Sequence, residues 1–373
     1  MKILQFIYSL GPGGAERFVL ELTNELAENN ETVIFSLRDS TIGNNGFYIP
    51  EISNKVRYVD LKISEGLKPG LIWMFYKILK SEKPDIVHCH LNLVNYFFLL
   101  SIIFRNKIRF IYTIHCSAES EVKLQHASGS EFKFAIERIV RKFFFKHRFF
   151  IPVAISTETK NSYQTYYKLK DVLVIYNGRK FSGRTINYEK VVDEIRAIKP
   201  TTDSLIFCHV GRYHEQKNQK MLVSVFNKLR EEGQDLVLLI IGDEFETAPE
   251  LKSLALDHIH FLGIRSNATD YLYASDAFCL SSFYEGMPIS LIEAFACACI
   301  PICTPVGGCI NTIEHGITGY LSKTVSEPDY LEAIRLFIRS RKTIDKEKLF
   351  NIYRDRFTIE QCTNSYLKLY SRL

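Results

Sequence analysis

The feature that most constrains the fold of this chain is an alternation of short apolar runs with helical stretches, which occurs once in each half. The apolar runs of the first half lie at residues 3–8, 32–37, 86–90, 110–115 and 149–155. Those of the second half lie at 205–210, 236–241, 260–262, 277–281 and 300–304. This alternation is typical of βαβ units and a parallel sheet. The sequence therefore predicts two doubly wound α/β domains, one after the other.

The boundary between these domains is expected near residue 178. Residues 177–200 are polar and show no clear strand. A chain of 373 residues is too long for one ordinary core, because domains usually have about 100 to 200 residues. We expect domains at 1–178 and 179–356, followed by a C-terminal helix at 357–373 that packs back on the first domain.

Composition and charge exclude several classes of protein. A net charge of +5 is too small for a dedicated nucleic-acid binder. The nine cysteines are an odd number and stand in apolar or small-residue segments, which is typical of reduced thiols. Residues 1–8 resemble a buried strand rather than a secretion signal, and no apolar run reaches the roughly 20 residues of a spanning helix. We expect a cytoplasmic protein that does not bind nucleic acid.

A glycine-rich turn follows the first predicted strand. Gly11, Gly13 and Gly14 precede a helix that should begin at about Ala15, and the N–H groups of a helix N terminus attract anions. A dinucleotide fingerprint would need a glycine where Glu16 stands, which disfavours a nicotinamide cofactor. Taken alone, the turn is either an anion site or only a tight connection between a strand and a helix.

A second turn, after the predicted strand at 205–210, carries two cations. Gly211 and Arg212 follow the strand directly, and Lys217 stands shortly after them. A guanidinium fork and an ammonium group beyond the end of a parallel strand suit a diphosphate. The alternative is a pair of hydrated surface cations, which is the usual state of arginine and lysine.

Two glutamates flank the start of a predicted helix in the second half. Glu285 lies in the loop before the helix, and Glu293 lies about two turns inside it. A buried glutamate needs a hydroxyl or a cation to offset its desolvation, and the two hydroxyls of a ribose meet this need. The N–H groups of residues 289–291, at the helix start, would face a phosphate or a hexose.

With these parts in place, the chain resembles the GT-B retaining glycosyltransferases grouped as family 4, which include lipopolysaccharide, capsule and mannosyl transferases. The likeness covers nearly the whole chain. It rests on segments 13–17, 85–88 and 211–212, Lys217, segments 241–243 and 261–263, the pair Glu285 and Glu293, and segment 306–308. The resemblance implies two Rossmann-like domains that face each other across a cleft, the N-terminal one for the acceptor and the C-terminal one for the nucleotide sugar.

The resemblance also implies roles for individual residues. Arg212 and Lys217 would hold the donor diphosphate, Glu293 the ribose and Glu285 the transferred sugar. His115, at the end of the predicted strand at 110–115, matches the family's cleft histidine, which would contact the donor sugar or support it near the reacting carbon, although a lone histidine is more often structural. The catalytic candidates are therefore His115, Arg212, Lys217 and Glu285. The further donor-binding candidates are Gly13, Gly14, Gly211, Gly263, Ile264, Arg265, Gly286, Met287, Pro288, Ile289, Ser290, Leu291 and Glu293, of which Gly14 would approach the distal phosphate and 263–265 the base.

The implied reaction moves a hexose from a UDP- or GDP-sugar to a hydroxyl of a sugar or lipid-linked saccharide, with retention at the anomeric carbon. It would serve the synthesis of bacterial surface polysaccharide or glycolipid. Two cations and the helix N termini would stabilise the departing diphosphate, so neither a cofactor nor a metal is expected.

Two other functions stay open. A nucleotide-sugar epimerase could share the architecture, although the spacing of Glu285 and Glu293 favours transfer. A non-catalytic nucleotide-sugar-binding subunit would be expected to lack the cations or the glutamates, all of which are present.

The chain departs from the family pattern after Asn177-Gly178. Arg179 and Lys180 stand there, where an aliphatic residue and an aspartate are usual. This departure places the contacts on the hinge side of the site in question.

Two clusters could suggest a metal, and we interpret both differently. His88 and His90 should lie on the same face of one strand, where family members carry similar histidines. A group of cysteines near residue 300 lacks the paired spacing of a zinc site and is expected to fill the core. These cysteines are Cys297, Cys299, Cys303 and Cys309.

A basic and aromatic stretch at residues 133–150 has two interpretations. Arg138, Arg141 and Lys142 are among its cations, and phenylalanines stand between them. Such a stretch could dock peripherally on anionic lipid headgroups at the inner face of the cell membrane. It could equally be an ordinary amphipathic helix whose phenylalanines enter the core while its cations remain hydrated.

Overall fold

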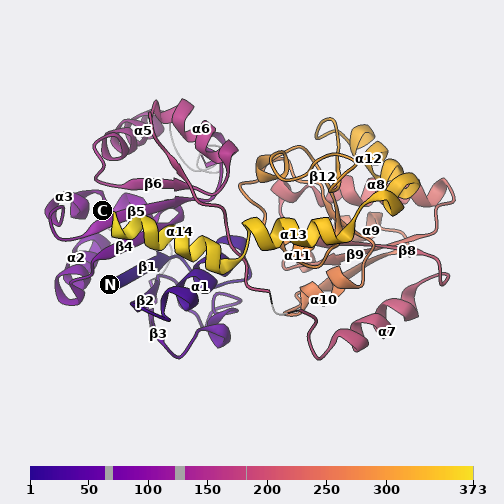
Figure 1. Ribbon diagram of the computed structural model, residues 1–373, viewed down its shortest axis with the longest axis horizontal. Coiled ribbons are helices and arrows are strands. Elements are labelled where there is room, and N and C mark those ends of the chain that lie inside the picture. Colours follow the sequence, from indigo (N-terminus) through magenta and orange to yellow (C-terminus); the bar gives the residue numbers. More distant parts are fainter. Residues whose placement is uncertain (64–69, 122–130, 182, 373) are drawn as a thin grey trace. The chain divides into compact units, whose positions relative to one another are not determined.

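The computed structural model describes all residues except 64–69, 122–130, 182 and 373, and for residues 131–134 it describes only the backbone. The chain divides into two compact units (Figure 1). The first contains Met1–Gly178 and Ile359–Leu373, and the second contains Arg179–Thr358. No helix within the described ranges combines the length and the apolar composition needed to span a membrane.

The first unit is built on a parallel sheet in the order β3-β2-β1-β4-β5-β6-β7. Its strands are β1 (Lys2–Ile7), β2 (Glu31–Ser36), β3 (Val56–Asp60), β4 (Ile86–His90), β5 (Arg109–Ile114), β6 (Ile151–Ala154) and β7 (Leu173–Val174). The strand order reverses between β1 and β4, which pair directly, with Gln5 opposite His88. In doubly wound sheets ligands bind beyond the carboxyl ends of the strands at such a reversal.

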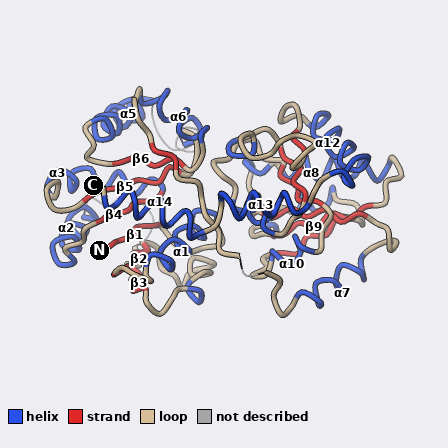
Figure 2. The backbone as a smooth tube through the Cα atoms, viewed as in Figure 1, coloured by secondary structure: helices blue, strands red, loops and turns tan. Residues whose placement is uncertain are grey.

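Helices cover the strands of this sheet, as Figure 2 shows. They are α1 (Gly14–Leu26), α2 (Gly70–Glu82), α3 (Val94–Ile103), α5 (Glu131–Lys146), α6 (Thr157–Tyr167) and α14 (Ile359–Ser371). One face of the sheet is apolar, with Leu4, Phe6 and Phe110 in a core that includes Phe97 and Phe144 of the covering helices. Successive residues of a strand point to opposite faces, so the other face receives the side chains between them.

That other face is polar at its centre and receives α14. Tyr370 on this helix hydrogen-bonds His88 of β4, with 2.9 Å between its Oη and Nδ1 of the histidine. Tyr366 bonds Thr113 of β5, with 2.8 Å between the two hydroxyl oxygens. All four side chains are fully or almost fully buried. The C-terminal helix is therefore attached to the first unit by a buried polar network as well as by apolar packing.

The second unit repeats the architecture with a parallel sheet in the order β10-β9-β8-β11-β12-β13. Its strands are β8 (Leu205–Val210), β9 (Leu236–Ile241), β10 (Ile259–Gly263), β11 (Ala277–Leu280), β12 (Ile300–Cys303) and β13 (Tyr320–Leu321). The central strand β9 is apolar throughout and buried along its whole length, as a strand covered on both faces must be. Here the order reverses between β8 and β11, which pair at Phe207 and Ala277.

The helices of the second unit are α7 (Tyr188–Ile198), α8 (Gln219–Glu231), α9 (Pro249–Leu254), α10 (Ala268–Tyr273), α11 (Ile289–Ala296), α12 (Glu327–Ser340) and α13 (Lys346–Arg356). Two of them begin with standard caps: the side chain of Ser326 accepts a hydrogen bond from the N–H of Asp329, and Asp345 accepts one from Glu347. The predicted fold class, two doubly wound parallel α/β units, is confirmed.

Candidate functional site

Lys217 and Glu285, two of the charged residues singled out in the second half, meet because β8 and β11 are neighbours in the sheet. Lys217 follows β8, and Glu285 follows β11. Since both strands are parallel, their carboxyl ends lie at the same edge, and the loops beyond them converge. The reversal of strand order, which only the folded sheet reveals, therefore brings together residues far apart in the sequence.

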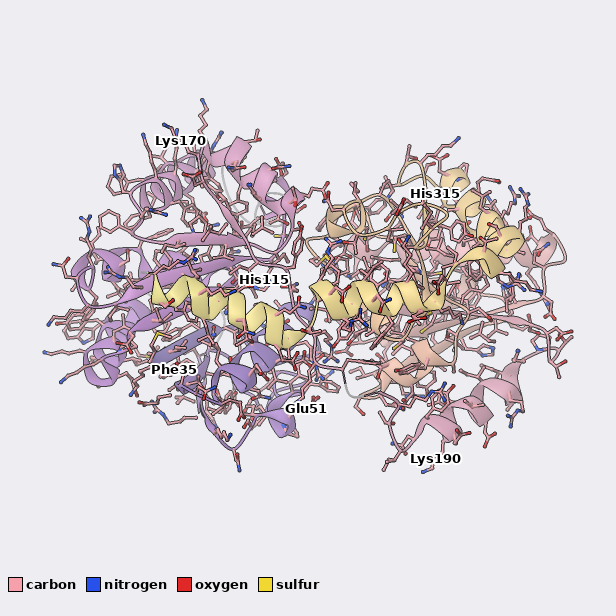
Figure 3. All side chains as sticks on the ribbon, in the orientation of Figure 1. Phe35, Glu51, His115, Lys170, Lys190 and His315 are labelled. Carbon is pink, nitrogen blue, oxygen red and sulfur yellow. The ribbon has the colours of Figure 1, made fainter. Side chains whose placement is uncertain are left out.

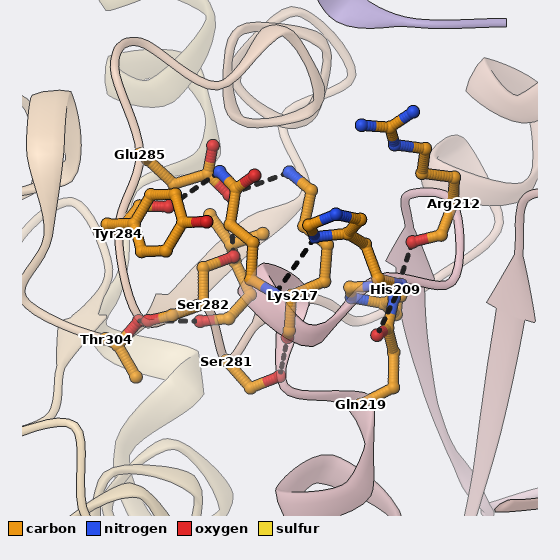
Figure 4. A network of polar contacts seen from close by, with 12 residues as sticks. His209, Arg212, Lys217, Gln219, Ser281, Ser282, Tyr284, Glu285 and Thr304 are labelled. Carbon is orange, nitrogen blue, oxygen red and sulfur yellow. Dashed lines mark hydrogen bonds and ion pairs between the residues drawn. The ribbon is translucent and has the colours of Figure 1, made fainter. Parts of the chain in front are cut away.

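Lys217 and Glu285 form an ion pair at this edge (Figure 4). The ammonium Nζ lies 2.7 Å from Oε1 of Glu285, and the hydroxyl of Ser282 donates to the same oxygen at 2.6 Å. The lysine side chain is 17% exposed and the glutamate 7%. No described residue bonds Oε2 of Glu285. One oxygen of this carboxylate is thus held from within, and the second remains available to a ligand.

The turn that carries Arg212 is fixed by a buried histidine and a glutamine. The Nδ1 atom of His209 donates to the carbonyl of Cys279 at 2.9 Å, so Nε2 can accept from the amide of Gln219 at 3.3 Å. That amide also donates to the carbonyl of Arg212 at 2.8 Å. Burial lowers the pKa of His209 to about 4, which keeps the ring neutral in this role.

The side chain of Arg212 itself is exposed and makes no hydrogen bond or ion pair with the residues that the structure describes. In Figure 4 no dashed line joins its guanidinium group to another residue drawn. Gly211 before it lies close to Lys217, since a β-carbon on Gly211 would be 3.6 Å from the lysine Cε. An unpaired guanidinium thus accompanies the ammonium group of Lys217 at the carboxyl end of β8.

Glu293, expected to be buried and to bind a ribose, is indeed buried, and its partner within the chain is a cation. Nε of Arg179 donates to its Oε1 at 2.8 Å. Arg179 is held in place in turn, because its N–H donates to the carbonyl of Phe357 at 2.9 Å and its own carbonyl accepts from the hydroxyl of Tyr353 at 2.9 Å. The arginine that departs from the family pattern therefore neutralises the ribose candidate.

The segment Gly286–Leu291 leads into α11, whose first residue is Ile289. Two glycines pack closely against the backbone of this segment. Gly308 donates its N–H to the carbonyl of Gly286. Gly307 leaves no room for a side chain, because a β-carbon there would lie only 2.4 Å from the carbonyl oxygen of Glu285. The expectation for the N–H groups of 289–291 needs one correction. The N–H of Leu291 already donates to the carbonyl of Pro288 at 3.2 Å, which closes the first turn of the helix.

Residues 263–265, expected near the base, follow β10 in the same unit. Gly263 has a φ of +68°, a value that favours glycine, and its carbonyl accepts from the N–H of Gly242 at 3.0 Å. The guanidinium of Arg265 donates to the hydroxyl of Tyr271 at 3.2 Å and lies 3.7 Å from a carboxylate oxygen of Glu194. Ile264 lies between these two positions, and its carbonyl accepts from Arg265 at 3.4 Å.

In the first unit, the glycine turn leads into α1 as expected, with Gly13 as the N-cap residue and Gly14 as the first helical one. The carboxylate of Glu16 lies close to Gly13, since a β-carbon there would be 2.1 Å from one of its oxygens. This carboxylate folds back over the helix N terminus. The predicted anion site therefore already has a negative group of its own chain beside it.

His115, which is labelled in Figure 3, follows β5 directly and is half-buried beside the fully buried histidines His88 and His90 of β4. Its Nε2 lies 3.1 Å from Nδ1 of His90, and the rings of His88 and His90 are 4.3 Å apart on the same face of β4. Burial lowers the pKa of His115 to about 4 and that of His88 to about 3. The three rings bond to one another or to Gln5, Thr113 and Tyr370. Across the described ranges, no group of three or more histidines, cysteines or acidic residues could hold a metal ion.

The helix α5, which contains most of the stretch 133–150, has both buried and exposed apolar side chains. Phe144 and Phe145 are buried in the core, and Arg141 is also buried, with Nη1 2.6 Å from the carboxylate of Glu121. In contrast, Ile136, Ile139 and Phe143 are 47%, 68% and 47% exposed. The side chains of Lys133 and Phe134 lie outside the described residues.

The cysteines near residue 300 are all buried, so their expected place in the core is confirmed.

Several residues that support the site were not predicted from the sequence. Ser282, His209 and Gln219 hold Glu285 and the turn at Arg212. Gly307 and Gly308 entered only as part of the family likeness. The sequence did mark Arg179 as unusual, because it departs from the family pattern. It did not indicate that Glu293 would be its partner.

Comparisons with known proteins point to one enzyme class. A family model described as glycosyltransferase family 4 matches residues 12–180, and one described as glycosyl transferases group 1 matches residues 191–351. Between them the two matches span most of both units.

Individual relatives agree with these matches. The chain is 27% identical over 319 residues to the N-acetylgalactosamine-N,N'-diacetylbacillosaminyl-diphospho-undecaprenol 4-alpha-N-acetylgalactosaminyltransferase of Campylobacter jejuni, a match that covers 81% of this chain and 80% of that protein. It is 25% identical over 315 residues to the capsular polysaccharide biosynthesis glycosyltransferase CapH of Staphylococcus aureus, covering 81% of each.

Solved structures share the fold. HepE of Anabaena, crystallised with UDP and glucose, superposes with a TM-score of 0.78 over all of both chains at 17% identity. Sucrose-phosphate synthase of Thermosynechococcus elongatus superposes with a TM-score of 0.78 at 16% identity, covering 100% of this chain and 98% of that one. At such identities the likeness concerns the fold alone.

Proposed function

The chain belongs to the family 4 glycosyltransferases of the GT-B fold, and we propose that it moves a hexose from a nucleotide diphosphate sugar to an acceptor hydroxyl with retention at the anomeric carbon. The reaction would serve the synthesis of a surface polysaccharide or glycolipid. In this proposal the second unit binds the donor and the first unit binds the acceptor.

The observation that carries the proposal is the edge of the second sheet beyond β8 and β11. It presents the exposed guanidinium of Arg212, the ammonium group of Lys217 and the carboxylate of Glu285 from converging loops. A departing nucleoside diphosphate gains negative charge in the transition state, and cations aimed at it lower the barrier. Arg212 suits a phosphate best, because its planar fork can donate two parallel hydrogen bonds.

The ion pair of Lys217 and Glu285 gives these two residues a shared role. Both known donors to Glu285 use Oε1, which leaves Oε2 to accept from a hydroxyl of the transferred sugar. Lys217 in turn has three N–H donors, of which one serves Glu285 and two remain for phosphate oxygens. We propose that the pair joins sugar recognition to diphosphate stabilisation in one rigid unit.

The transfer itself needs no group to be oxidised or reduced. The bond between the anomeric carbon and the diphosphate oxygen breaks, and a bond to the acceptor oxygen forms on the same face of the sugar. The acceptor proton leaves with the diphosphate. Arg212, Lys217 and the N terminus of α11 supply the positive field for this charge.

The names of relatives support the substrate classes. The Campylobacter jejuni relative is named for a diphospho-undecaprenol-linked acceptor, and the Staphylococcus aureus one for capsular polysaccharide synthesis. A sugar or lipid-linked saccharide acceptor is therefore proposed for this chain, together with the UDP- or GDP-sugar donor that the family likeness implies.

The proposal is tested with a panel of UDP- and GDP-sugars, first by thermal shift and then by transfer to lipid-linked saccharide acceptors. We expect one donor to raise the melting temperature and to yield a product whose new linkage has the anomeric configuration of the donor. Product NMR measures that configuration. An inverted linkage would contradict retention, a changed sugar on an intact nucleotide would favour the epimerase, and binding without any turnover would favour the non-catalytic subunit.

We also propose that the first unit touches an anionic membrane through α5. Ile136, Ile139 and Phe143 recur at helical spacing and are exposed, and Lys142 and Lys146 stand next to them in the sequence. An apolar stripe with flanking lysines fits the boundary between acyl chains and anionic headgroups. An acceptor attached to a lipid would lie in that same membrane.

Cosedimentation with vesicles tests this contact. Binding to phosphatidylcholine vesicles that contain phosphatidylglycerol should exceed binding to phosphatidylcholine alone. The double variant Ile139→Ser/Phe143→Ser should lose about tenfold or more in partitioning, since each buried apolar side chain contributes about 1.5 to 3 kcal/mol. Leu254→Ser/Leu256→Ser removes two exposed leucines of the second unit and is the matched control. Equal partitioning of both double variants would refute the contact.

A further inference from the structure

A chain of hydrogen bonds links three strands of the first unit and ends at His115. It begins at the side chain of Gln5 on β1, whose Oε1 lies 2.8 Å from Nε2 of His90 on β4. The other nitrogen of His90, Nδ1, lies 3.1 Å from Nε2 of His115, directly after β5. Gln5 and His90 are completely buried, and His115 is half-buried.

Each imidazole in this chain is neutral near pH 7. Burial lowers the pKa of His90 well below its ordinary value, and it lowers the pKa of His115 to about 4. A neutral imidazole has one nitrogen that donates and one that accepts. When one nitrogen of a ring donates, the other must accept. The tautomer of one ring therefore fixes the tautomer of the ring that is bonded to it.

The first member of the chain sets that direction. With the amide oxygen of Gln5 facing His90, this oxygen can only accept, so Nε2 of His90 carries the hydrogen and Nδ1 of His90 accepts. Nε2 of His115 must then donate, which leaves a lone pair on Nδ1 of His115. No described residue bonds this Nδ1 atom.

We propose that Gln5 and His90 are positioning residues that hold His115 in its Nε2–H tautomer, so that Nδ1 accepts a hydrogen bond from a substrate hydroxyl. This inference deepens the proposed function and rests on it for the identity of the hydroxyl. The family likeness implies that His115 meets the sugar, and the inference adds the tautomer of the ring and the residues that set it. With this tautomer Nδ1 suits an O–H group, because a phosphate or carboxylate oxygen carries no hydrogen at neutral pH and would meet a lone pair.

His88 provides an internal comparison. Its two nitrogens lie 2.9 Å from the hydroxyl of Tyr370 and 2.6 Å from that of Thr113. Hydroxyl groups can both donate and accept, so these partners permit either tautomer of His88. Of the two buried histidines of β4, His90 is the one bonded to an amide oxygen, and only through it does Gln5 act on His115.

The tautomer can be measured directly on the full chain. Long-range ¹H–¹⁵N spectra of protein with labelled histidines distinguish an Nε2–H from an Nδ1–H ring, and His115→Asn identifies the signal. We expect His115 to be an Nε2–H ring at pH 7.5. An Nδ1–H ring in the wild-type protein would overturn the proposal, because it would mean that the amide group of Gln5 faces His90 with its nitrogen. This wild-type measurement does not depend on whether any variant folds.

Two variants of Gln5 then test its part. Gln5→Glu keeps an accepting oxygen and should keep the His115 tautomer. Gln5→Leu removes the acceptor and should give a mixture of tautomers at His115. An unchanged His115 signal in a folded Gln5→Leu protein would show that Gln5 does not set the tautomer.

An activity measurement completes the design. Gln5→Leu should lower kcat/KM for transfer by roughly tenfold, the scale of one lost hydrogen bond, while Gln5→Glu should stay near wild type. Equal activity of the two variants, with the tautomers as expected, would refute the hydroxyl contact but not the tautomer assignment. If no sugar is transferred by the wild-type protein, the proposed function fails, and the spectra still decide the tautomer.

Discussion

Arg179 and Glu293 form an ion pair within the second unit, with 2.8 Å between Nε of the arginine and Oε1 of the glutamate. Their side chains are only 9% and 11% exposed. A carboxylate removed from water to this extent needs a partner. Arg179 meets that need before any nucleotide binds, so the ribose hydroxyls would join a carboxylate that is already oriented.

Removal of one member of this pair should destabilise the second unit. Arg179→Met leaves the buried carboxylate without its cation, and the expected loss in free energy of unfolding is about 3 to 5 kcal/mol. The double variant Arg179→Met/Glu293→Leu removes both charges and should lose less than Arg179→Met alone. Denaturant unfolding of both proteins measures the difference. A double variant that is the less stable of the two would show that the pair is not a coupled one.

Glu293 should contact the ribose of the donor. Glu293→Gln keeps the shape but replaces charge-assisted hydrogen bonds with neutral ones, so affinity for the nucleoside diphosphate should fall roughly tenfold or more. Loss of both ribose hydroxyls should then cost the variant much less than it costs the wild type. Calorimetry with the diphosphate and its dideoxy analogue on both proteins completes this cycle, and strictly additive losses would place the ribose elsewhere.

The stability of the first unit should fall as the pH drops. Burial lowers the pKa of His88 to about 3 and of His115 to about 4, whereas an unfolded histidine titrates near about 6.5. Above that pH both states are neutral and the full stability is present. Below it the unfolded chain takes up protons that the folded one does not, at a cost of about 1.4 kcal/mol per pH unit for each such histidine.

His88→Asn tests the sign and origin of this effect. The variant should show a smaller loss of unfolding free energy between about pH 6.5 and pH 4 than the wild type, because one proton-linked group is gone. Urea unfolding at several pH values, followed by a probe in the first unit, measures the slope. Equal slopes for the two proteins would mean that His88 is not responsible.

Activity should not depend on an added divalent metal. Arg212, Lys217 and the N terminus of α11 already supply positive charge for the departing diphosphate. Turnover measured with and without a chelator is expected to agree. Loss of activity on chelation and its recovery with magnesium or manganese would refute this prediction.

The central strands were predictable from the sequence, and so was the edge strand β10, whereas the edge strands β3, β7 and β13 were not. Strands such as β9 are apolar along their whole length because both faces are covered. β3 has one buried residue, Val56, and β7 and β13 have two residues each, so none stands out as an apolar run. The helix α7 lies in a segment interpreted as a polar junction, because only Val191 and Ile195 are buried along it.

The residues of the candidate site were predictable as types, but their pairing was not. Lys217 and Glu285 each stand after a predicted strand, yet their contact depends on β8 lying beside β11. Arg179 and Glu293 are 114 residues apart in the sequence, and the spacing of charges along the chain gives no register for such a pair. The hydrogen bonds of Gln5 with His90 likewise depend on which strands are neighbours.

The most direct test of the donor site is the turnover of Arg212→Ala. Its guanidinium bonds no described residue, so its removal should leave folding intact and act only on the ligand. Arg339→Ala, which removes a 66% exposed arginine from α12 of the same unit, is the matched control. We predict that turnover falls by about two to three orders of magnitude in Arg212→Ala, the scale seen when one charge-stabilising donor is lost, and stays at the wild-type level in Arg339→Ala. Wild-type turnover in a folded Arg212→Ala protein would contradict the assignment of this sheet edge to the diphosphate.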